Sequence, residues 1–109
     1  MPLKDANIST IERLRRDPAF AKALLAEAAT SFLDGETVEA RLFLRDIVNG
    51  TIGFEALSQA TDIPAKSLHR MLTIPGNPTM DNLSAIFVAV SQHLSVDVVA
   101  KASRSSHAA

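Results

Sequence analysis

The sequence predicts an all-α fold in one domain, on three observations. Apolar residues recur at the i, i+3, i+4 spacing of helices that bury one side. N-capping residues and Gly or Pro pairs mark where these stretches begin and end. The 109 residues are 47% hydrophobic, which is enough for one core, and they include no Cys, which excludes a disulfide framework and a thiolate metal site.

Residues 1–50 are predicted to form an N-terminal helical extension packed on the same core. The N-terminus is polar, and Asp17-Pro18 combines an N-cap with a first-turn proline, so it predicts the start of a helix that ends at Asp34-Gly35. A second helix is predicted from about residue 36 to residue 48, ending at Asn49-Gly50. The positions expected to be apolar and inward are Phe20, Leu24, Ala28 and Phe32 in the first helix, and Val38, Leu42, Leu44, Ile47 and Val48 in the second.

Residues 54–72, FEALSQATDIPAKSLHRML, predict two short helices joined by a sharp turn, the form of a helix-turn-helix. The turn falls at Thr61-Asp62-Ile63-Pro64, because Asp tolerates left-handed geometry and Pro suits a first helical position. The predicted buried residues are Phe54, Leu57 and Ala60 before the turn, and Leu68, Met71 and Leu72 after it. The outer face of the second helix begins with a short side chain and then carries several hydrogen-bond donors, as expected of a helix that enters the major groove. Its residues are Ala65, Lys66, Ser67, His69 and Arg70.

A last helix is predicted after the loop Ile74-Pro75-Gly76-Asn77-Pro78, where two prolines and a glycine cannot continue a helix. Thr79 or Asn77 is expected to cap this helix, which completes a DNA-binding domain over residues 51–96. Its one-sided apolar pattern is Leu83, Ile86, Phe87, Val90 and Leu94. Residues 95–99 fit either an edge strand or a fraying helix end, and residues 97–109 are expected to be a flexible tail.

The charge balance is close to neutral, with 11 basic and 12 acidic residues and a net charge of −1. DNA-binding domains are usually basic, whereas residues 51–96 contain only two cations, Lys66 and Arg70. Non-specific DNA affinity should therefore be weak, and a specific site needs two subunits whose recognition helices lie about 34–36 Å apart. We therefore expect a homodimer. The basic run Arg13, Arg15 and Arg16 is interpreted as a solvated end rather than an arm in the groove.

The sequence favours a cytoplasmic protein with no catalytic role. The N-terminus lacks the apolar region of a signal peptide, and no apolar run approaches the roughly 18 residues of a membrane span. His69, His93 and His107 belong to no set with metal-ligand spacing, and Ser67-Leu68-His69 places its side chains on different helix faces. We expect no metal, no cofactor and no enzyme activity.

These residues resemble the Cro/repressor-type (Xre) helix-turn-helix regulators, and more narrowly the HigA-like antitoxins, or addiction-module antidote proteins, of bacterial toxin–antitoxin pairs. The matching stretches are DPAFAKALLAEA, LRDIV, GFEALSQATDIPAKSLHRML and GNPTMDNLSAIF, within residues 17–96. The resemblance implies a five-helix Cro/repressor-like fold in a homodimer that binds double-stranded operator DNA and autorepresses its operon. It also implies a RelE-like ribosome-dependent mRNase toxin as partner. The chain departs from the family pattern at Ser58, where Ala is usual, and at Asp62, where Gly is usual.

The resemblance also implies which residues contact DNA. Ala65, Lys66 and Arg70 fall where family members reach base edges, with His69 on the same face, and Ser67 falls where a hydroxyl meets a phosphate. Arg70 is the better base reader, since a guanidinium fork bonds guanine O6 and N7 together, while Lys66 reads a base or binds phosphate. Asn77 and Thr79 contact a phosphate, as the family's loop does, or simply cap the helix that follows.

Two other functions remain open at this point. One is a free-standing or prophage repressor with the same fold and no toxin, which the neighbouring gene would distinguish. The other is a helical protein–protein adaptor whose N-terminal helices bind a partner while the DNA-binding motif is vestigial. The slightly acidic charge balance favours the adaptor, and the absence of salt-dependent DNA binding would promote it.

Overall fold

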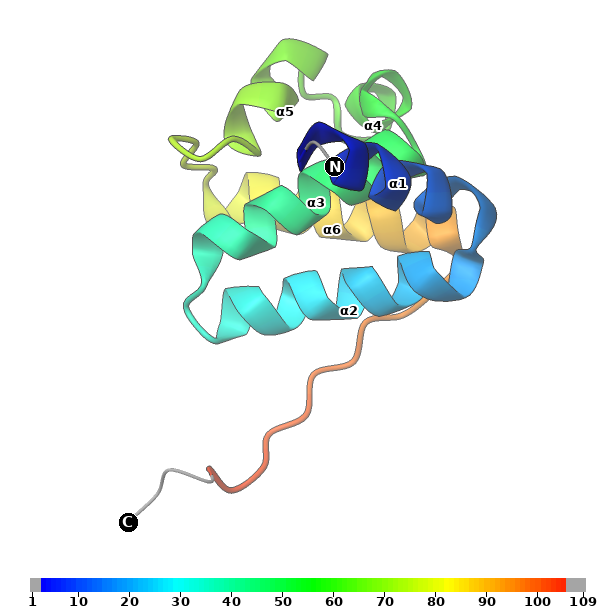
Figure 1. Cartoon of the computed structure of the whole chain (residues 1–109). Helices are drawn as coiled ribbons and strands as arrows, with labels where there is room; N and C mark the ends of the chain where they lie inside the picture. The colour runs from blue at the N-terminus through cyan, green and yellow to red at the C-terminus, as the bar shows by residue number, and fades with distance from the viewer. Residues whose placement is uncertain (1–2, 106–109) are drawn as a thin grey trace.

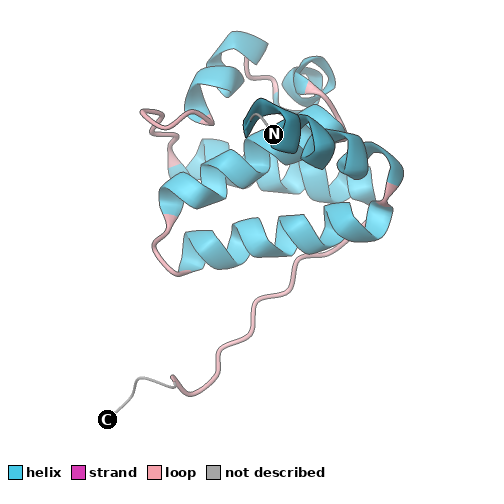
Figure 2. Cartoon of the chain, viewed as in Figure 1, coloured by secondary structure: helices cyan, strands magenta, loops and turns pink. Residues whose placement is uncertain are grey.

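The computed structural model describes residues 3–105, with side chains from residue 8 onward, and this part of the chain forms six helices. They are α1 (Leu3–Arg16), α2 (Pro18–Leu33), α3 (Thr37–Gly50), α4 (Phe54–Thr61), α5 (Ala65–Met71) and α6 (Met80–Leu94). No strand occurs in the described residues, which confirms an all-α fold (Figure 2). None of these helices is long and apolar enough to cross a bilayer. In Figure 1, α4 and α5 lie above α2, α3 and α6.

The structure has one helix more than the five expected. The additional helix is α1, in the polar N-terminal segment for which no helix was predicted. Its residues Ile8, Ile11 and Leu14 recur at steps of three, and Leu14 is buried with 3% of its surface exposed. α1 packs on α3, where a Cβ on Gly50 would overlap the Leu14 side chain. The helix that was predicted to stop at Asn49-Gly50 therefore continues through Gly50 and supports α1 there.

One hydrophobic core joins the N-terminal helices to residues 51–96. Its largest fully buried side chains come from α2 to α6 and from the residue after α5: Leu25, Leu44, Ile47, Val48, Leu57, Leu68, Leu72, Ile86 and Val90. Two predicted core positions are wrong, because Val38 and Ala60 are exposed. By helical periodicity, Val38 falls on the side of α3 opposite Ile47, and Ala60 falls beside the face of α4 that buries Phe54 and Leu57. The region that carries the candidate site is thus anchored to the same core as α2 and α3.

The buried face of α2 is rotated from the predicted one. Ala21, Leu25, Ala28 and Ser31 are buried, whereas Phe20, Leu24 and Phe32 are only half-buried and pack at the edge of the core. A step of four residues exceeds the 3.6 residues of one helical turn, so a series at that step drifts around the axis. Phe20, Leu24 and Phe32 therefore end on the rim, and the neighbouring helices face Leu25 together with the small residues of α2.

The predicted helix starts are mostly confirmed. Asp17 is the N-cap of α2, and its carboxylate accepts a hydrogen bond from the Phe20 N–H at 3.1 Å. Thr79 caps α6 by accepting from the Asn82 N–H at 3.1 Å. Pro64 is the N-cap of α5 rather than its first helical residue, because the helix begins at Ala65. Each of these caps fixes where a helix enters the bundle.

Arg13 is bound to the protein surface rather than freely solvated. Its guanidinium lies 4.0 Å above the centre of the Phe20 ring, and its Nε is 3.4 Å from the Asp17 carboxylate. Arg15 and Arg16, in the same last turn of α1, are exposed. The basic run therefore both joins α1 to α2 and leaves two cations on the surface.

The chain after α6 is neither of the two alternatives left open for residues 95–99, an edge strand or a fraying helix end. Ser95 takes a left-handed conformation, with φ of 56°, and ends the helix. Residues 96–105 then form irregular chain, in which Val96 packs against the core and the following residues leave the bundle (Figure 1). Residues 97–105 are exposed. Residues 106–109 of the predicted tail lie outside the described residues.

Candidate nucleic-acid interface

The turn between α4 and α5 is closed by its own hydrogen bonds. Asp62 takes a left-handed conformation, with φ of 59° and ψ of 29°, and its N–H donates to the Ser58 carbonyl at 2.8 Å. The Ser58 hydroxyl donates to the Ile63 carbonyl at 2.6 Å. Thr61 Oγ1 donates to the Leu57 carbonyl at 2.8 Å and accepts from the Ile63 N–H at 3.4 Å. Because α4 bonds directly to the turn, the start of α5 is fixed relative to α4.

α5 turns one face to the core and the other to solvent. Leu68 in the helix and Leu72 directly after it are fully buried. The side chains of Lys66 and Arg70, one turn apart, are exposed and form no hydrogen bond or ion pair with another described residue. The exposed face of α5 therefore presents two cationic donors that are available to an anionic partner.

The other predicted residues of α5 lie at the edges of this exposed face. The His69 imidazole is exposed and stacks on the Phe54 ring, with 3.7 Å between ring centroids and 19° between planes. Stacking uses the face of the imidazole, so the nitrogens at its edge remain able to form hydrogen bonds. Ala65 is half-buried against the core, and Ser67 is also half-buried. His69 thus connects the start of α4 to the middle of α5.

The loop after α5 is held tightly against that helix. The Thr73 N–H and hydroxyl both donate to the Arg70 carbonyl, at 3.3 and 2.7 Å. The Gly76 N–H donates in turn to the Thr73 carbonyl at 3.0 Å. Gly76 lies so close to the Arg70 and Met71 carbonyls that a Cβ there would overlap both of them. This close approach explains why a glycine occupies the position.

Arg41 of α3 also binds this loop, and it was not among the residues predicted for the site. Its Nε donates to the Thr73 carbonyl at 3.2 Å, and its Nη2 donates to the Ile74 carbonyl at 2.9 Å. The guanidinium therefore holds two successive carbonyls with both prongs of its fork. A single arginine in an amphipathic helix carries no sequence signal for such a contact.

Asn77 and Thr79 lie beyond this loop, where the chain enters α6. Thr79 has the predicted capping role, since its Oγ1 accepts from the Asn82 N–H at 3.1 Å, and its hydroxyl hydrogen is still able to donate. Asn77 is exposed and forms no hydrogen bond with another described residue. Both border a hollow of about 330 Å³ that Arg70 also lines, which we call the α5–α6 hollow. The structure thus brings Arg70, Asn77 and Thr79 together.

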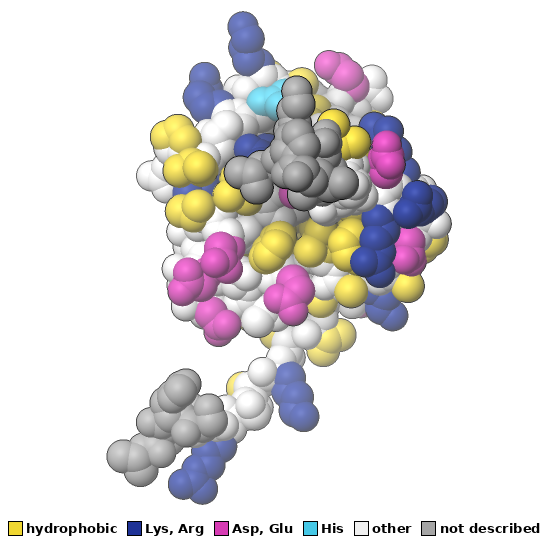
Figure 3. Space-filling model, viewed as in Figure 1, with side chains coloured by type: hydrophobic (Ala, Val, Ile, Leu, Met, Phe, Trp, Pro, Cys, Tyr) yellow, Lys and Arg dark blue, Asp and Glu magenta, His cyan; other side chains and the backbone are white. Residues whose placement is uncertain are grey.

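One acidic cluster lies apart from the cations of α5, although the sum of the charges is close to zero. Figure 3 shows Lys and Arg side chains over α5 at the top and over the end of α1 at the right. Asp and Glu side chains gather at the lower left, over the turn between α2 and α3, where Asp34, Glu36 and Glu39 are exposed. The α5 surface is therefore locally basic in an overall acidic chain.

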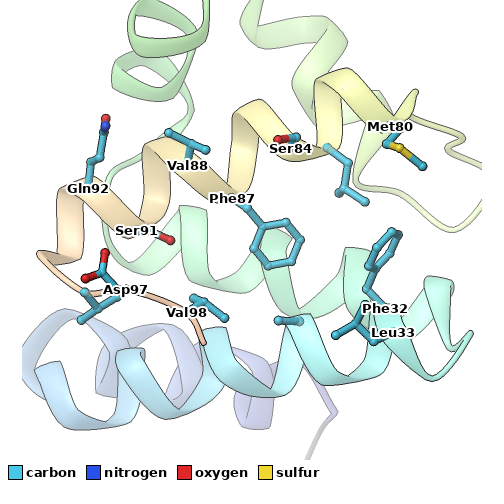
Figure 4. Close-up of a pocket in the computed structure, with 13 residues that line it drawn as sticks. Phe32, Leu33, Met80, Ser84, Phe87, Val88, Ser91, Gln92, Asp97 and Val98 are labelled. Atoms are coloured by element: carbon cyan, nitrogen blue, oxygen red, sulfur yellow. The ribbon is translucent and has the colours of Figure 1, made fainter. Parts of the chain in front are cut away.

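A second candidate surface is an apolar groove of about 510 Å³ between α2, α6 and the segment that follows α6. Figure 4 shows the rings of Phe32 and Phe87 between the two helices. Leu33, Met80 and Val88 border the groove, with 67%, 79% and 52% of their surfaces exposed. Exposed apolar side chains grouped in this way are typical of protein-binding surfaces.

Metal-binding geometry is absent from the described residues, where no three His, Asp or Glu side chains lie close enough to hold an ion. His69 lies on α5 and His93 in the last turn of α6. His107 lies outside the described residues.

In comparisons with known proteins, no protein-family model, no curated protein and no solved structure matches this chain.

Proposed function

We propose that this protein is a sequence-specific transcriptional regulator that binds double-stranded operator DNA through α5. The observation that carries the proposal is the pair Lys66 and Arg70, exposed and unpaired among the described residues, on a helix whose other face is fixed in the core. A rigid helix of this kind suits the width and the acceptor pattern of the major groove. In this proposal α4 and α5 are a helix-turn-helix, in which the second helix reads the bases.

The exposure of the side chains on α5 and its loop supports separate roles in reading bases and in contacting phosphates. Arg70 reads a guanine through its fork, and Lys66 and His69 contact bases or phosphates at the same groove edge. Ser67, Asn77 and Thr79 donate to backbone phosphates, which set the register without reading sequence. Ala65 is half-buried, so it offers only its methyl group, which suits contact with a thymine methyl.

The proposed active form is a homodimer. A single copy presents only Lys66 and Arg70 on α5, which gives too few phosphate and base contacts for tight binding at physiological salt. Two copies related by a two-fold axis double these contacts and read the two halves of a palindromic site.

The test of α5 is the variant Arg70→Ala, compared with Arg104→Ala in the exposed tail as a control that removes the same charge. We expect Arg70→Ala to weaken binding to the protein's own promoter by about 10- to 100-fold and to leave its thermal stability unchanged, because Arg70 forms no side-chain bond within the described protein. Arg104→Ala should bind like the wild type. Unchanged promoter affinity of Arg70→Ala would contradict the assignment of α5 as the reading helix.

From the resemblance to HigA-like antitoxins we also propose that the regulator neutralises a toxin encoded beside it, of the RelE-like mRNase class. The test is co-expression with the adjacent small reading frame, if that frame encodes a basic protein. Rescue of growth and a stable complex of both proteins would support an antitoxin. Growth arrest that this protein does not relieve would favour the free-standing or prophage repressor.

The apolar groove between α2 and α6 favours a second candidate function, a helical adaptor that binds another protein. A chain with exposed Leu33, Met80 and Val88 around one groove has a surface suited to an apolar partner. The two functions differ in one measurement, since an adaptor would show no salt-dependent binding to duplex DNA.

A further inference from the structure

Arg41 connects two parts of the molecule that the proposed function uses together. It lies in α3, outside the two-helix unit of α4 and α5, and its two hydrogen bonds end on the carbonyls of Thr73 and Ile74 in the loop behind α5. Thr73 in this loop donates two hydrogen bonds to the Arg70 carbonyl, and the loop then leads to Asn77. Arg41 therefore bonds to the stretch of chain that joins Arg70 to Asn77.

We propose that Arg41 is a positioning residue that holds Asn77 where its carboxamide contacts the backbone of the DNA whose bases Arg70 reads. This inference rests on the proposed function. Asn77 is exposed, has no hydrogen-bond partner among the described residues, and lines the α5–α6 hollow together with Arg70. Because its side chain is not held by a bond of its own, its position depends on the backbone of the loop.

Arg41 favours DNA binding in this proposal because it lowers the entropy cost of ordering the loop. Bonds from a charged guanidinium to two successive carbonyls fix the backbone before DNA arrives, so binding does not have to order it. The Thr73 carbonyl that accepts from Arg41 also accepts from the Gly76 N–H, so the residue before Asn77 is held by the same group. Without Arg41, the loop loses this support and Asn77 samples more positions.

The test is a double-mutant cycle of Arg41→Ala and Asn77→Ala, with binding to a duplex of the protein's own promoter as the readout. Arg41→Ala should weaken binding about tenfold, but less than about twofold when Asn77 is already Ala. Arg41→Gln, which keeps part of the packing, should behave like Arg41→Ala. The control is Arg45→Ala, one turn further along α3, whose Nε lies 4.0 Å from Asp46 and makes no hydrogen bond to the loop. It should bind like the wild type.

Two further readouts separate positioning from direct contact. The salt dependence of binding should keep its slope in Arg41→Ala, because an arginine that itself neutralised a phosphate would reduce the slope by about one. Amide exchange of Gly76 in the free protein should be about tenfold faster in Arg41→Ala than in Arg45→Ala. Additive losses in the cycle, a reduced slope, or unchanged Gly76 exchange would each overturn the inference. A wild type that binds no duplex would instead overturn the proposed function, and with it this role of Arg41.

Discussion

Asp46 in α3 carries a carboxylate that the fold places in an unfavourable setting. The side chain is 18% exposed, its Oδ1 has no hydrogen-bond partner among the described residues, and the Arg45 Nε lies 4.0 Å away. Burial raises the pKa of Asp46 above its ordinary value, and Arg45 only partly opposes the shift. At neutral pH the ionised group therefore costs folding free energy.

Asp46→Asn should raise the melting temperature at pH 7 and have much less effect near pH 3. A raised pKa in the folded state means that the folded protein binds this proton more tightly than the unfolded chain does. Asp46 therefore contributes most to stability below its unfolded pKa, and this contribution is lost as the pH rises through the folded pKa. Thermal unfolding of both proteins from about pH 3 to pH 7 measures the difference. An equal difference in melting temperature between the two proteins at about pH 3 and at pH 7 would contradict this account of Asp46.

At the residue scale, the sequence located the candidate site but not all the bonds that build it. Asp62 was predicted to tolerate left-handed geometry, and it adopts that geometry. Ser58 was identified only as a departure from the usual Ala, yet its hydroxyl donates to the Ile63 carbonyl across the turn. Arg41 gave no signal, because its bonds to Thr73 and Ile74 depend on how α3 packs beside a distant loop. Periodicity predicts which face of a helix is buried, but it does not predict partners distant in sequence.

At the element scale, the contact between α1 and α3 was the feature least visible in the sequence. Gly50 resembles a helix stop, yet it lies inside α3 and makes room for Leu14. The polar N-terminus did not predict a helix, because only Leu14 is buried among the described side chains of α1, residues 8–16. By contrast, α6 has the predicted Thr79 cap and the predicted buried residues Leu83, Ile86 and Val90. A strong one-sided pattern with a clear cap is predictable, whereas a weakly amphipathic terminal helix is not.

Gly50→Ala should destabilise the protein by about 1–3 kcal/mol, although alanine is the better helix former by about 1 kcal/mol. The added methyl would overlap the Leu14 side chain and force α1 away from α3. Urea unfolding at pH 7 measures the loss. The matched control is Asn49→Ala, an exposed position in the same turn, which should be neutral or slightly stabilising. A Gly50→Ala variant as stable as the wild type would show that α1 does not pack closely on α3.

At the scale of the whole molecule, net charge is a poor guide to the proposed function. The sum of −1 first favoured an adaptor, but the basic side chains over α5 and over the end of α1 lie apart from the acidic turn between α2 and α3 (Figure 3). Composition does not report this separation, because it arises only when the helices pack. A locally basic surface in an acidic protein predicts weak non-specific binding together with selective binding to a matched site.

The measurement that tests the central claim most directly is a salt titration of binding between the wild-type protein and the promoter DNA immediately upstream of its own gene, with an unrelated duplex as control. The proposed function predicts that the promoter binds at least about 10³-fold more tightly than the control and that its affinity falls linearly with salt on logarithmic axes. Equal, weak binding to both duplexes would contradict it, and the adaptor with its apolar groove would become the better account.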